Sequence, residues 1–336
     1  MDSQHKQWLN MPYNQLRQQY PYADQFFQTM GLSILEGSHC VEDYVSKLAP
    51  QVLEDIGIER SQLGHAFISF LENMNQLQQE DKQIIESVTI LGGTDKEGRK
   101  ENLHLTLRPG DIVAIVGPTG SGKSRLLADI EWMAQGDTPT GRQVLINGKA
   151  PEPEKRFAVE SKLVAQLSQN MNFVMDLSVA EFISLHAESR LNRRDDIIEK
   201  VLEQANKLAG EPFTADTPLT SLSGGQSRAL MIADTALLSR SPIVLIDEIE
   251  NAGVDRQEAL QVLVGQDKIV LMATHDPILA LMAQRRLIIE KGSVKQVIET
   301  TDEEQKTLQE LLHWDQKLMA YRNHLRKGKK LLAFHD

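Results

Sequence analysis

Residues 117–124, GPTGSGKS, form the stretch of this chain whose composition and spacing point most directly to chemistry. They match the pattern G-x-x-x-x-G-K-S throughout, between the apolar segment DIVAIV and the helix-forming segment SRLLADIEWMA. Glycines let the backbone wrap closely around phosphate groups, and the start of the following helix adds oriented amides and the positive end of its dipole. Lys123 is expected to neutralise the phosphates and Ser124 to bind magnesium. The full set expected to hold a phosphorylated ligand is Gly117, Pro118, Thr119, Gly120, Ser121, Gly122, Lys123, Ser124 and Arg125.

A pair of carboxylates follows an apolar segment further along the chain. The segment PIVLIDE, residues 242–248, predicts a buried strand that ends in Asp247 and Glu248. In phosphoryl transfer, a carboxylate at such a position holds magnesium, and a neighbouring one polarises the attacking water. We therefore expect Asp247 to be a metal ligand and Glu248 to be a catalytic residue.

A second glycine-rich stretch, SLSGGQSRAL at residues 221–230, also has the composition of a phosphate-binding element. A chain that already has a phosphate loop does not need a second one for the same ligand. This stretch therefore requires a separate explanation.

The overall composition is that of an ordinary globular protein. The chain has 336 residues, of which 41% are hydrophobic, so it can bury one large domain with additions, or two domains. Its net charge of −11 argues against bulk electrostatic attraction to nucleic acid or to anionic lipid. The single cysteine, Cys40, excludes an internal disulfide and a multi-cysteine metal site within one chain. Since no apolar run has the length of a signal peptide or a membrane span, we expect a cytoplasmic protein.

Three regions follow one another along the chain. Residues 1–85 have apolar positions at helical spacing and are rich in acidic side chains, which predicts an acidic helical module. In residues 86–300, strand patterns such as IVAIV and KIVLMAT alternate with helical ones, which is typical of a parallel α/β core. Residues 301–336 predict a C-terminal helix with a basic end. Its last segment, RNHLRKGKK, is either a solvated helix end or a docking element for an acidic partner, RNA or a membrane face.

Residues 86–300 resemble the ATP-binding cassette (ABC) superfamily, whose signature LSGGQ stands here at residues 222–226. The resemblance implies an α/β fold, a P-loop NTPase of ABC type with a parallel core sheet, an antiparallel β part and a helical subdomain. The all-α N-terminal module is an addition to that fold. In this family the signature contacts the γ-phosphate bound on a second copy of the domain. The resemblance therefore implies that hydrolysis needs a head-to-tail pair, in which the residues acting in trans are Ser223, Gly224, Gly225 and Gln226.

Three further segments match family elements. QNMNFVMDLSVAEF resembles the Q-loop, where the spacing to LSVAE favours Gln169 over Gln166 as the residue that contacts magnesium or water. MATHD places His275 as the switch histidine, which in the family bonds the γ-phosphate. NAGVD occupies the position of the D-loop, with Asp255 as its acidic end at the nucleotide site.

The sequence also departs from the family pattern. Ile249 and Glu250 stand where transport cassettes usually have Pro-Thr, and AGVD replaces the commoner SALD. No Phe, Tyr or Trp occurs from Leu71 through Glu131, so the ring that normally stacks on adenine is missing. The base selectivity is therefore open. The candidate replacements are Ile90, Leu91, His104 or an aromatic ring from the N-terminal module.

The resemblance implies an ATPase that converts ATP and water to ADP and phosphate, with Mg²⁺ as its cofactor and a second cassette as its partner. One hypothesis is a soluble, non-transport cassette resembling the activator of methyl-coenzyme M reductase. Such a cassette couples closure to the remodelling or activation of a protein partner through the N-terminal module. The alternative is the ATP-hydrolysing subunit of a membrane transporter with separate membrane-spanning subunits. The sequence identifies neither the protein partner nor a transported substrate.

Overall fold

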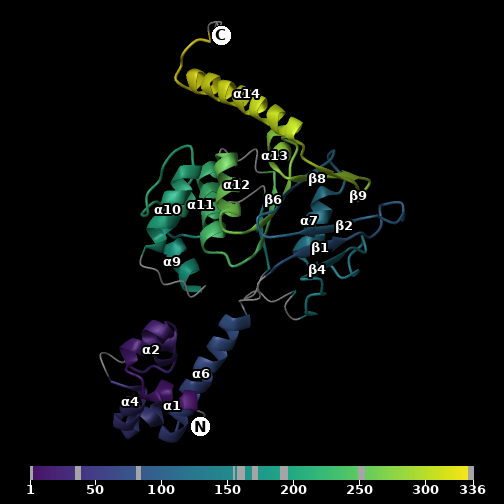
Figure 1. Ribbon diagram of the computed structural model, residues 1–336. Helices are drawn as coiled ribbons and strands as arrows, with labels where there is room; N and C mark the ends of the chain where they lie inside the picture. Colours follow the sequence, from purple (N-terminus) through teal and green to yellow (C-terminus); the bar gives the residue numbers. More distant parts are fainter. Residues whose placement is uncertain are drawn as a thin grey trace. The chain divides into compact units, whose positions relative to one another are not determined.

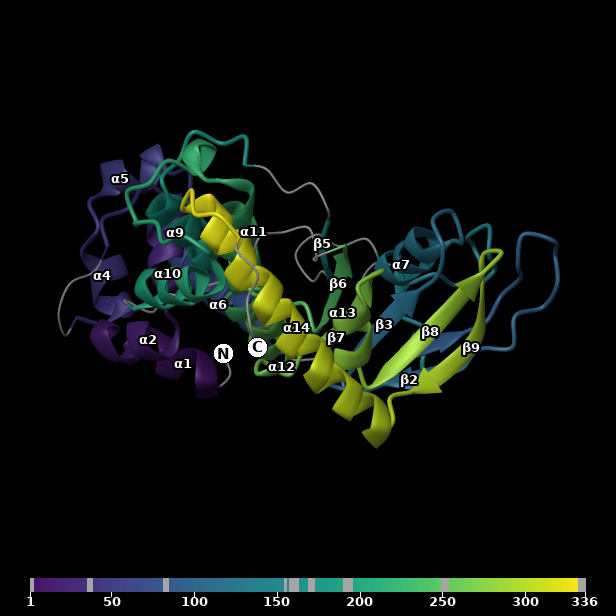
Figure 2. The same cartoon turned by 90° about the horizontal axis from the view of Figure 1, so that it is seen from above.

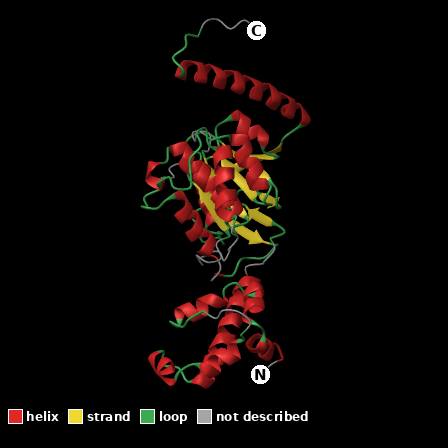
Figure 3. Ribbon diagram, turned by 90° about the vertical axis from the view of Figure 1, so that its left-hand side faces the viewer, coloured by secondary structure: helices red, strands yellow, loops and turns green. Residues whose placement is uncertain are grey.

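The computed structural model describes residues 3–34, 39–80, 85–153, 156, 163–168, 173–189, 196–248 and 254–331. The chain forms two compact units, one of Met1–Ile84 and the other of Ile85–Arg190 with Arg194–Asp336. Among the described residues, helices build the first unit and the strands lie in the second (Figure 3).

The N-terminal unit packs several short helices and the longer helix α6 around an aromatic core. Phe26 and Phe67 are buried with their ring centroids 5.1 Å apart. Tyr22 is 1% exposed, and its hydroxyl donates to Asn75 Oδ1 at 2.7 Å, while its ring contacts that of Phe70. These rings therefore form part of the core of the N-terminal unit. The helices are α1 (Ser3–Asn10), α2 (Tyr13–Gln19), α3 (Ala23–Thr29), α4 (Val41–Lys47), α5 (Pro50–Asp55) and α6 (Arg60–Glu80).

The second unit is organised around a six-stranded sheet in the order β5-β6-β7-β3-β8-β9. Its strands are β3 (Ile112–Val116), β5 (Val164–Leu167), β6 (Ile243–Asp247), β7 (Ile269–Ala273), β8 (Arg285–Glu290) and β9 (Ser293–Glu299). All neighbours pair in parallel except β8 and β9, which are antiparallel. Ala273 lies opposite both Ile115 and Asp247, so β3, β6 and β7 end at one edge of the sheet.

A second, antiparallel sheet of order β2-β1-β4 consists of β1 (Val88–Leu91), β2 (His104–Leu107) and β4 (Gln143–Ile146). Helix α7 (Lys123–Glu131) follows β3 in the chain (Figure 2) and packs against β5 and β7 of the parallel sheet and β4 of the antiparallel one. Leu126 and Ile130 of α7 belong to the same buried cluster as Ile90 of this sheet and Ile115 of the parallel one. The helix that begins at the phosphate loop is therefore packed among strands of both sheets.

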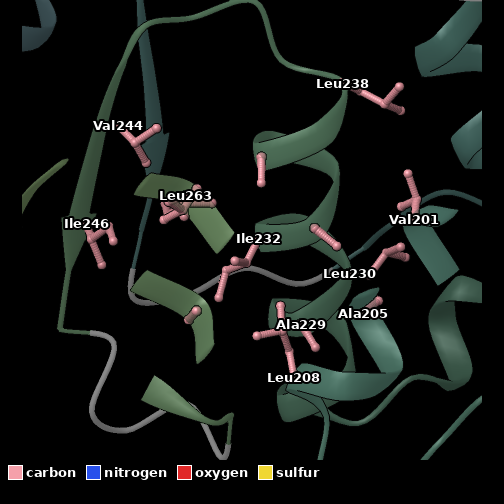
Figure 4. Packing of buried hydrophobic residues seen from close by; sticks show 14 of the residues in the cluster. Val201, Ala205, Leu208, Ala229, Leu230, Ile232, Leu238, Val244, Ile246 and Leu263 are labelled. Atoms are coloured by element: carbon pink, nitrogen blue, oxygen red, sulfur yellow. The ribbon is translucent and has the colours of Figure 1, made fainter. Parts of the chain in front are cut away.

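Helices α9 (Val179–Ser189), α10 (Ile197–Leu208), α11 (Gly224–Leu237) and α12 (Arg256–Val264) gather on the other side of the parallel sheet from β1, β2 and β4 (Figure 1). The short elements η1 (Leu219–Ser221) and α13 (Pro277–Met282) complete this part. Figure 4 shows Ile232 of α11 directed toward Ile246 of β6, with Val201 and Ala205 of α10 on the opposite side. Helix α11 therefore packs between α10 and the sheet.

The chain ends in the long helix α14 (Asp302–Arg326). Leu308 is buried, and Arg286 of β8 donates to Glu304 at 2.6 Å. Within the residues that the structure describes, no helix is both long and apolar enough to cross a membrane. The parallel core sheet, the antiparallel β part, the helical part and the all-α N-terminal unit expected from the sequence are confirmed.

A buried ionic cluster ties the phosphate-loop helix to the β8–β9 turn. The Arg142 side chain is 0% exposed and donates to Glu101 and to Asp129 of α7, each at 2.8 Å. Burial alone would lower the pKa of the Arg142 guanidinium, but its hydrogen bonds to both carboxylates, together with their negative charge, hold the pKa above its usual value. Arg142 also donates to the Gly292 carbonyl at 2.7 Å, and Gly292 N–H donates to the Ser121 carbonyl at 2.7 Å. The cluster thus supports the phosphate loop from behind.

Replacing Arg142 by Met should destabilise the chain by about 3–5 kcal/mol, because two buried carboxylates lose the cation with which they pair. Urea unfolding of the second unit measures this. The matched control is Arg99→Met. The Arg99 side chain pairs with Asp95 but is itself 61% exposed, so this substitution should change the free energy of unfolding little. Equal effects of the two substitutions would contradict a structural role for the cluster.

Candidate functional site

The phosphate loop, residues 117–124, connects the end of β3 to the start of α7. Gly122 has φ of +113°, and a Cβ there would lie 2.8 Å from Gly292 Cα, so only glycine fits. A Cβ on Gly117 would lie 2.5 Å from the Ile289 carbonyl oxygen. The loop therefore follows the β8–β9 turn closely, while Pro118, Thr119 and Gly120 are exposed.

Two groups of this loop are suited to a phosphate. Lys123 Nζ donates to the Gly117 carbonyl at 2.8 Å and to the Pro118 carbonyl at 3.4 Å, so the ammonium folds back over the loop. Ser121 is 6% exposed, and its Oγ has no hydrogen-bond partner among the described residues. Phosphate oxygens would satisfy both groups. Ser124 and Arg125, at the start of α7, are exposed.

A second lysine contacts the loop, and sequence reasoning missed it. Lys96 Nζ donates to the Gly120 carbonyl at 3.0 Å, and the Lys96 backbone N–H donates to the Lys291 carbonyl at 3.0 Å. The available signal was the turn-forming segment GGTDKEGRK between β1 and β2, which contains three basic residues and precedes the phosphate loop in the chain. Lys96 thus adds positive charge beside the loop.

The two carboxylates lie where the parallel strands end. Asp247 is the last residue of β6, and Glu248 N–H donates to the Ala273 carbonyl at 3.0 Å. Glu248 has φ of +53°, a conformation that costs a non-glycine residue about 1–3 kcal/mol and clusters at functional sites. His275 Nδ1 lies 3.9 Å from Glu248 Oε1. The structure thus brings Glu248 and His275 together at the edge from which the phosphate loop also starts.

The turn that carries His275 is held on both sides. Thr274 N–H donates to the Ile115 carbonyl at 3.2 Å, and Asp276 caps α13 by accepting from the N–H groups of Ile278 and Leu279. Arg256, the first residue of α12, pairs with Asp276. The residue before it, Asp255, caps α12 by accepting from the N–H groups of Gln257 and Glu258 at 3.0 and 3.1 Å. The structure thus gives the Asp255 carboxylate a local capping role.

The signature residues lie at the start of α11 and form a capping box. Ser223 Oγ accepts from the Gln226 N–H at 3.3 Å, and Gln226 Oε1 accepts from the Ser223 N–H at 2.9 Å. Within the described part of the chain, the N–H groups of Gly224 and Gly225 donate no hydrogen bond. Ser223 and Gly224 are exposed, so this helix start offers donors to an anion.

The signature and the phosphate loop are not joined within one chain. Between the parts that the structure describes, no hydrogen bond or ion pair connects residues 223–226 with residues 117–124. Farther along α11, however, Arg228 and Ile232 line one small pocket with Asp247 and Glu248. Helix α11 therefore lines a pocket with the two carboxylates, whereas the N–H groups at its N-terminus remain available to another molecule.

Two further expectations have different outcomes. Gln169 lies outside the described residues, as does the segment 249–253. Ile90 was wrong as a candidate base-stacking residue, because its side chain is fully buried in the core between the sheets. Leu91 is half-buried and pairs in register with the exposed His104, so these two remain candidates for contact with a base.

Several known proteins are similar to this chain. The family model described as ABC transporter matches residues 100–251. An ABC transporter ATP-binding protein of Methanocaldococcus jannaschii is 51% identical over 248 residues, which covers 74% of this chain and 95% of that protein. A macrolide export ATP-binding/permease protein MacB of Campylobacter jejuni is 31% identical over 234 residues, or 62% of this chain and 35% of that protein. A solved dimeric ATP-binding cassette with ADP and Pi has a TM-score of 0.48 and 23% identity, covering 64% of this chain and 99% of that chain.

The missing ring predicts loose discrimination between nucleotides. A stacked pair of rings is worth about 0.5–1.5 kcal/mol, so without it GTP should bind within about tenfold of ATP. Competition of GTP against a fluorescent ATP analogue measures the ratio. A preference for ATP of about a hundredfold or more would show that a specific group recognises adenine.

Proposed function

Because the chain belongs to the family of ABC transporter ATP-binding proteins and is an ATPase, we propose that two copies pair head to tail around Mg-ATP and couple this closure to work on a protein partner. The observation that carries the proposal is the division of the site. The phosphate loop, Asp247, Glu248 and His275 gather at one edge of the sheet, whereas the signature stands apart with unoccupied backbone donors. A second copy supplies the missing donors.

We assign a role to each residue on the phosphate-loop side of the site. Lys123 neutralises the β- and γ-phosphates of ATP, and its ammonium group donates to their oxygens instead of to the Gly117 carbonyl. Ser124 and Asp247 carry the hard oxygen ligands that suit Mg²⁺ and would hold it, with Gln169 as a further ligand. Mg²⁺ supplies charge neutralisation on the phosphate oxygens during transfer.

Hydrolysis requires a polarised water and a stabilised γ-phosphate. Glu248 is partly exposed at the end of β6, and its carboxylate orients the water and takes its proton. His275 lies within reach of Glu248 and hydrogen-bonds the γ-phosphate as its charge grows. Ser223 and the N–H groups of Gly224 and Gly225 approach the same phosphate from the second copy. Gln226 holds this helix start in place through the capping box.

The finer role that we propose is a soluble, cytoplasmic, non-transport cassette that resembles the activator of methyl-coenzyme M reductase and that remodels or activates a protein partner through the N-terminal unit. The support is the unit itself, which has its own compact aromatic core. In addition, the match to the M. jannaschii relative covers 95% of that protein but 74% of this chain, so about a quarter of this chain lies outside the match.

The second candidate is the ATP-hydrolysing subunit of a membrane transporter. The names of the relatives favour it, because the M. jannaschii protein is named as an ABC transporter ATP-binding protein and MacB as a macrolide exporter. On this alternative, separate membrane-spanning subunits are the partners.

ATP should tighten the dimer of the Glu248→Gln variant by at least about tenfold, because bound ATP bridges the two copies and is not hydrolysed. Lys123→Ala, which loses the phosphate contacts, is the matched control and should respond to ATP little. Sedimentation velocity with and without Mg-ATP measures both variants. An unchanged dimer affinity in Glu248→Gln would contradict the shared site.

Deleting residues 1–84 should abolish partner binding and leave most of the basal ATPase rate, because the second unit is compact without them. Full-length and truncated chains, both carrying Glu248→Gln, are compared by affinity capture in the presence of ATP, which measures partner binding. Fractionation of the cell extract then shows whether each chain is found with membranes. If both chains instead fractionate with membranes and bind a membrane-spanning protein, the transporter subunit is the correct assignment.

A further inference from the structure

Helix α14 carries an apolar stripe on a surface that the rest of its unit leaves exposed. Trp314, Leu318 and Leu325 are 60%, 51% and 54% exposed. With the half-buried Leu311 and Tyr321 they follow one another at intervals of three and four residues. This alternation is the spacing of a coiled-coil seam, in which the stripe of one helix packs against that of another. The stripe is therefore suited to pairing with a helix.

The first part of α14 is anchored to the second unit. Arg286 pairs with Glu304, and Leu308 is buried against the core. Arg256, whose other guanidinium nitrogen pairs with Asp276 beside His275, also pairs with Asp315. Beyond Asp315 the helix continues to Arg326 with the exposed Leu318, Met319 and Leu325. Figure 1 shows that α14 stands out from the rest of its unit. A helical segment as short as the part beyond Asp315 is marginal in water without packing, so a partner would stabilise it.

Charge is segregated along the helix. From residue 302 to 315 there are five acidic residues and one basic residue, whereas from 316 to 331 there are six basic residues and no acidic one. Two such helices side by side in parallel would place like charges together. In the antiparallel arrangement the acidic half of each helix faces the basic half of the other, and the helix dipoles also oppose. The charge pattern therefore favours a second copy of α14 in antiparallel orientation.

We propose that α14 pairs antiparallel with α14 of a second copy and holds two chains together without nucleotide. Such a contact is isologous, because the same stripe serves both partners around a two-fold axis. It goes beyond the ATP-driven pairing of the proposed function. By keeping two cassettes close, the paired helices raise the effective concentration at which each phosphate loop meets a signature. Arg256 pairs with both Asp276 and Asp315, so the anchored part of α14 is connected to the turn that carries His275.

The first test measures self-association without nucleotide, in the Lys123→Ala background so that cassette closure does not contribute. Leu318→Glu should weaken the dimer by at least about tenfold, because the charge enters the seam twice. Met319→Glu is the matched control. It is 53% exposed and adjacent in sequence but lies off the stripe, so its effect should be within about twofold.

Since both side chains are more than half exposed, neither substitution should unfold the chain, and circular dichroism checks this. A monomer of the Lys123→Ala chain at about 100 μM protein, well above the micromolar range of ordinary specific pairs, would overturn the proposal. Equal weakening by Leu318→Glu and Met319→Glu would also overturn it. Neither result bears on ATP-driven closure of Glu248→Gln, so the two accounts fail separately.

The second test determines orientation. In a Cys40→Ser background, a mixture of Leu311→Cys and Leu325→Cys chains is treated with a short bis-maleimide. Antiparallel pairing brings Leu311 of one chain toward Leu325 of the other, so the mixed cross-link should dominate. The Cys40→Ser change keeps an acceptor for the Asp43 N–H at the start of α4. Rapid cross-linking of Leu325→Cys chains to one another would indicate a parallel pair and contradict the proposal.

Discussion

The parallel pairing of β3, β6 and β7 is the constraint on which the site depends. Parallel strands end at the same edge of a sheet, and the register places Ala273 opposite both Ile115 and Asp247. The three segments that leave these strands are the phosphate loop, the Glu248 turn and the His275 turn. They converge because the strands are in register, although they are far apart in the sequence. The turns are then held locally, by the β8–β9 turn behind Gly122 and by Asp276 at the start of α13.

The same constraint explains why the site is divided. A strand edge collects only the residues that follow strands, and the signature follows none. It stands at the start of α11, where the capping box provides acceptors for the N–H groups of Ser223 and Gln226. The N–H groups of Gly224 and Gly225 donate no hydrogen bond in the described part of the chain. Helix α11 nevertheless packs Ile232 against Ile246 of β6 and lines a pocket with Glu248. In the proposed mechanism, a contact made by this helix start with a second copy is therefore connected through α11 to Glu248, the carboxylate proposed to act on water.

Local pattern predicted the phosphate loop and the strand that leads into Asp247 and Glu248, because each depends on a few neighbouring residues. The alternation of strand and helix patterns predicted the parallel α/β core, whereas the ABC type of the fold was implied by the resemblance that the signature carries. The contacts that support the site were not predictable in this way. Arg142 and Glu101, Lys96 and Gly120, and Arg256 and Asp315 are distant in the chain, and only the folded structure brings them together. Ile90 failed as a base-stacking candidate for a related reason, since alternation along β1 does not show which face the antiparallel sheet buries.

The central claim is that one chain supplies the phosphate loop and the other the signature of each site, and complementation between two inactive variants tests it directly. Lys123→Ala disables the loop. Gly224→Asp disables the signature by placing a negative charge where the γ-phosphate must approach, and its added side chain meets open space in the fold. A mixed dimer then contains one site with both defects and one with none. Each variant alone should be inactive, and the mixture should recover ATPase activity up to about a quarter of the wild-type rate for random two-fold pairing. If the mixture stays as inactive as its components, the loop and the signature do not meet across two chains.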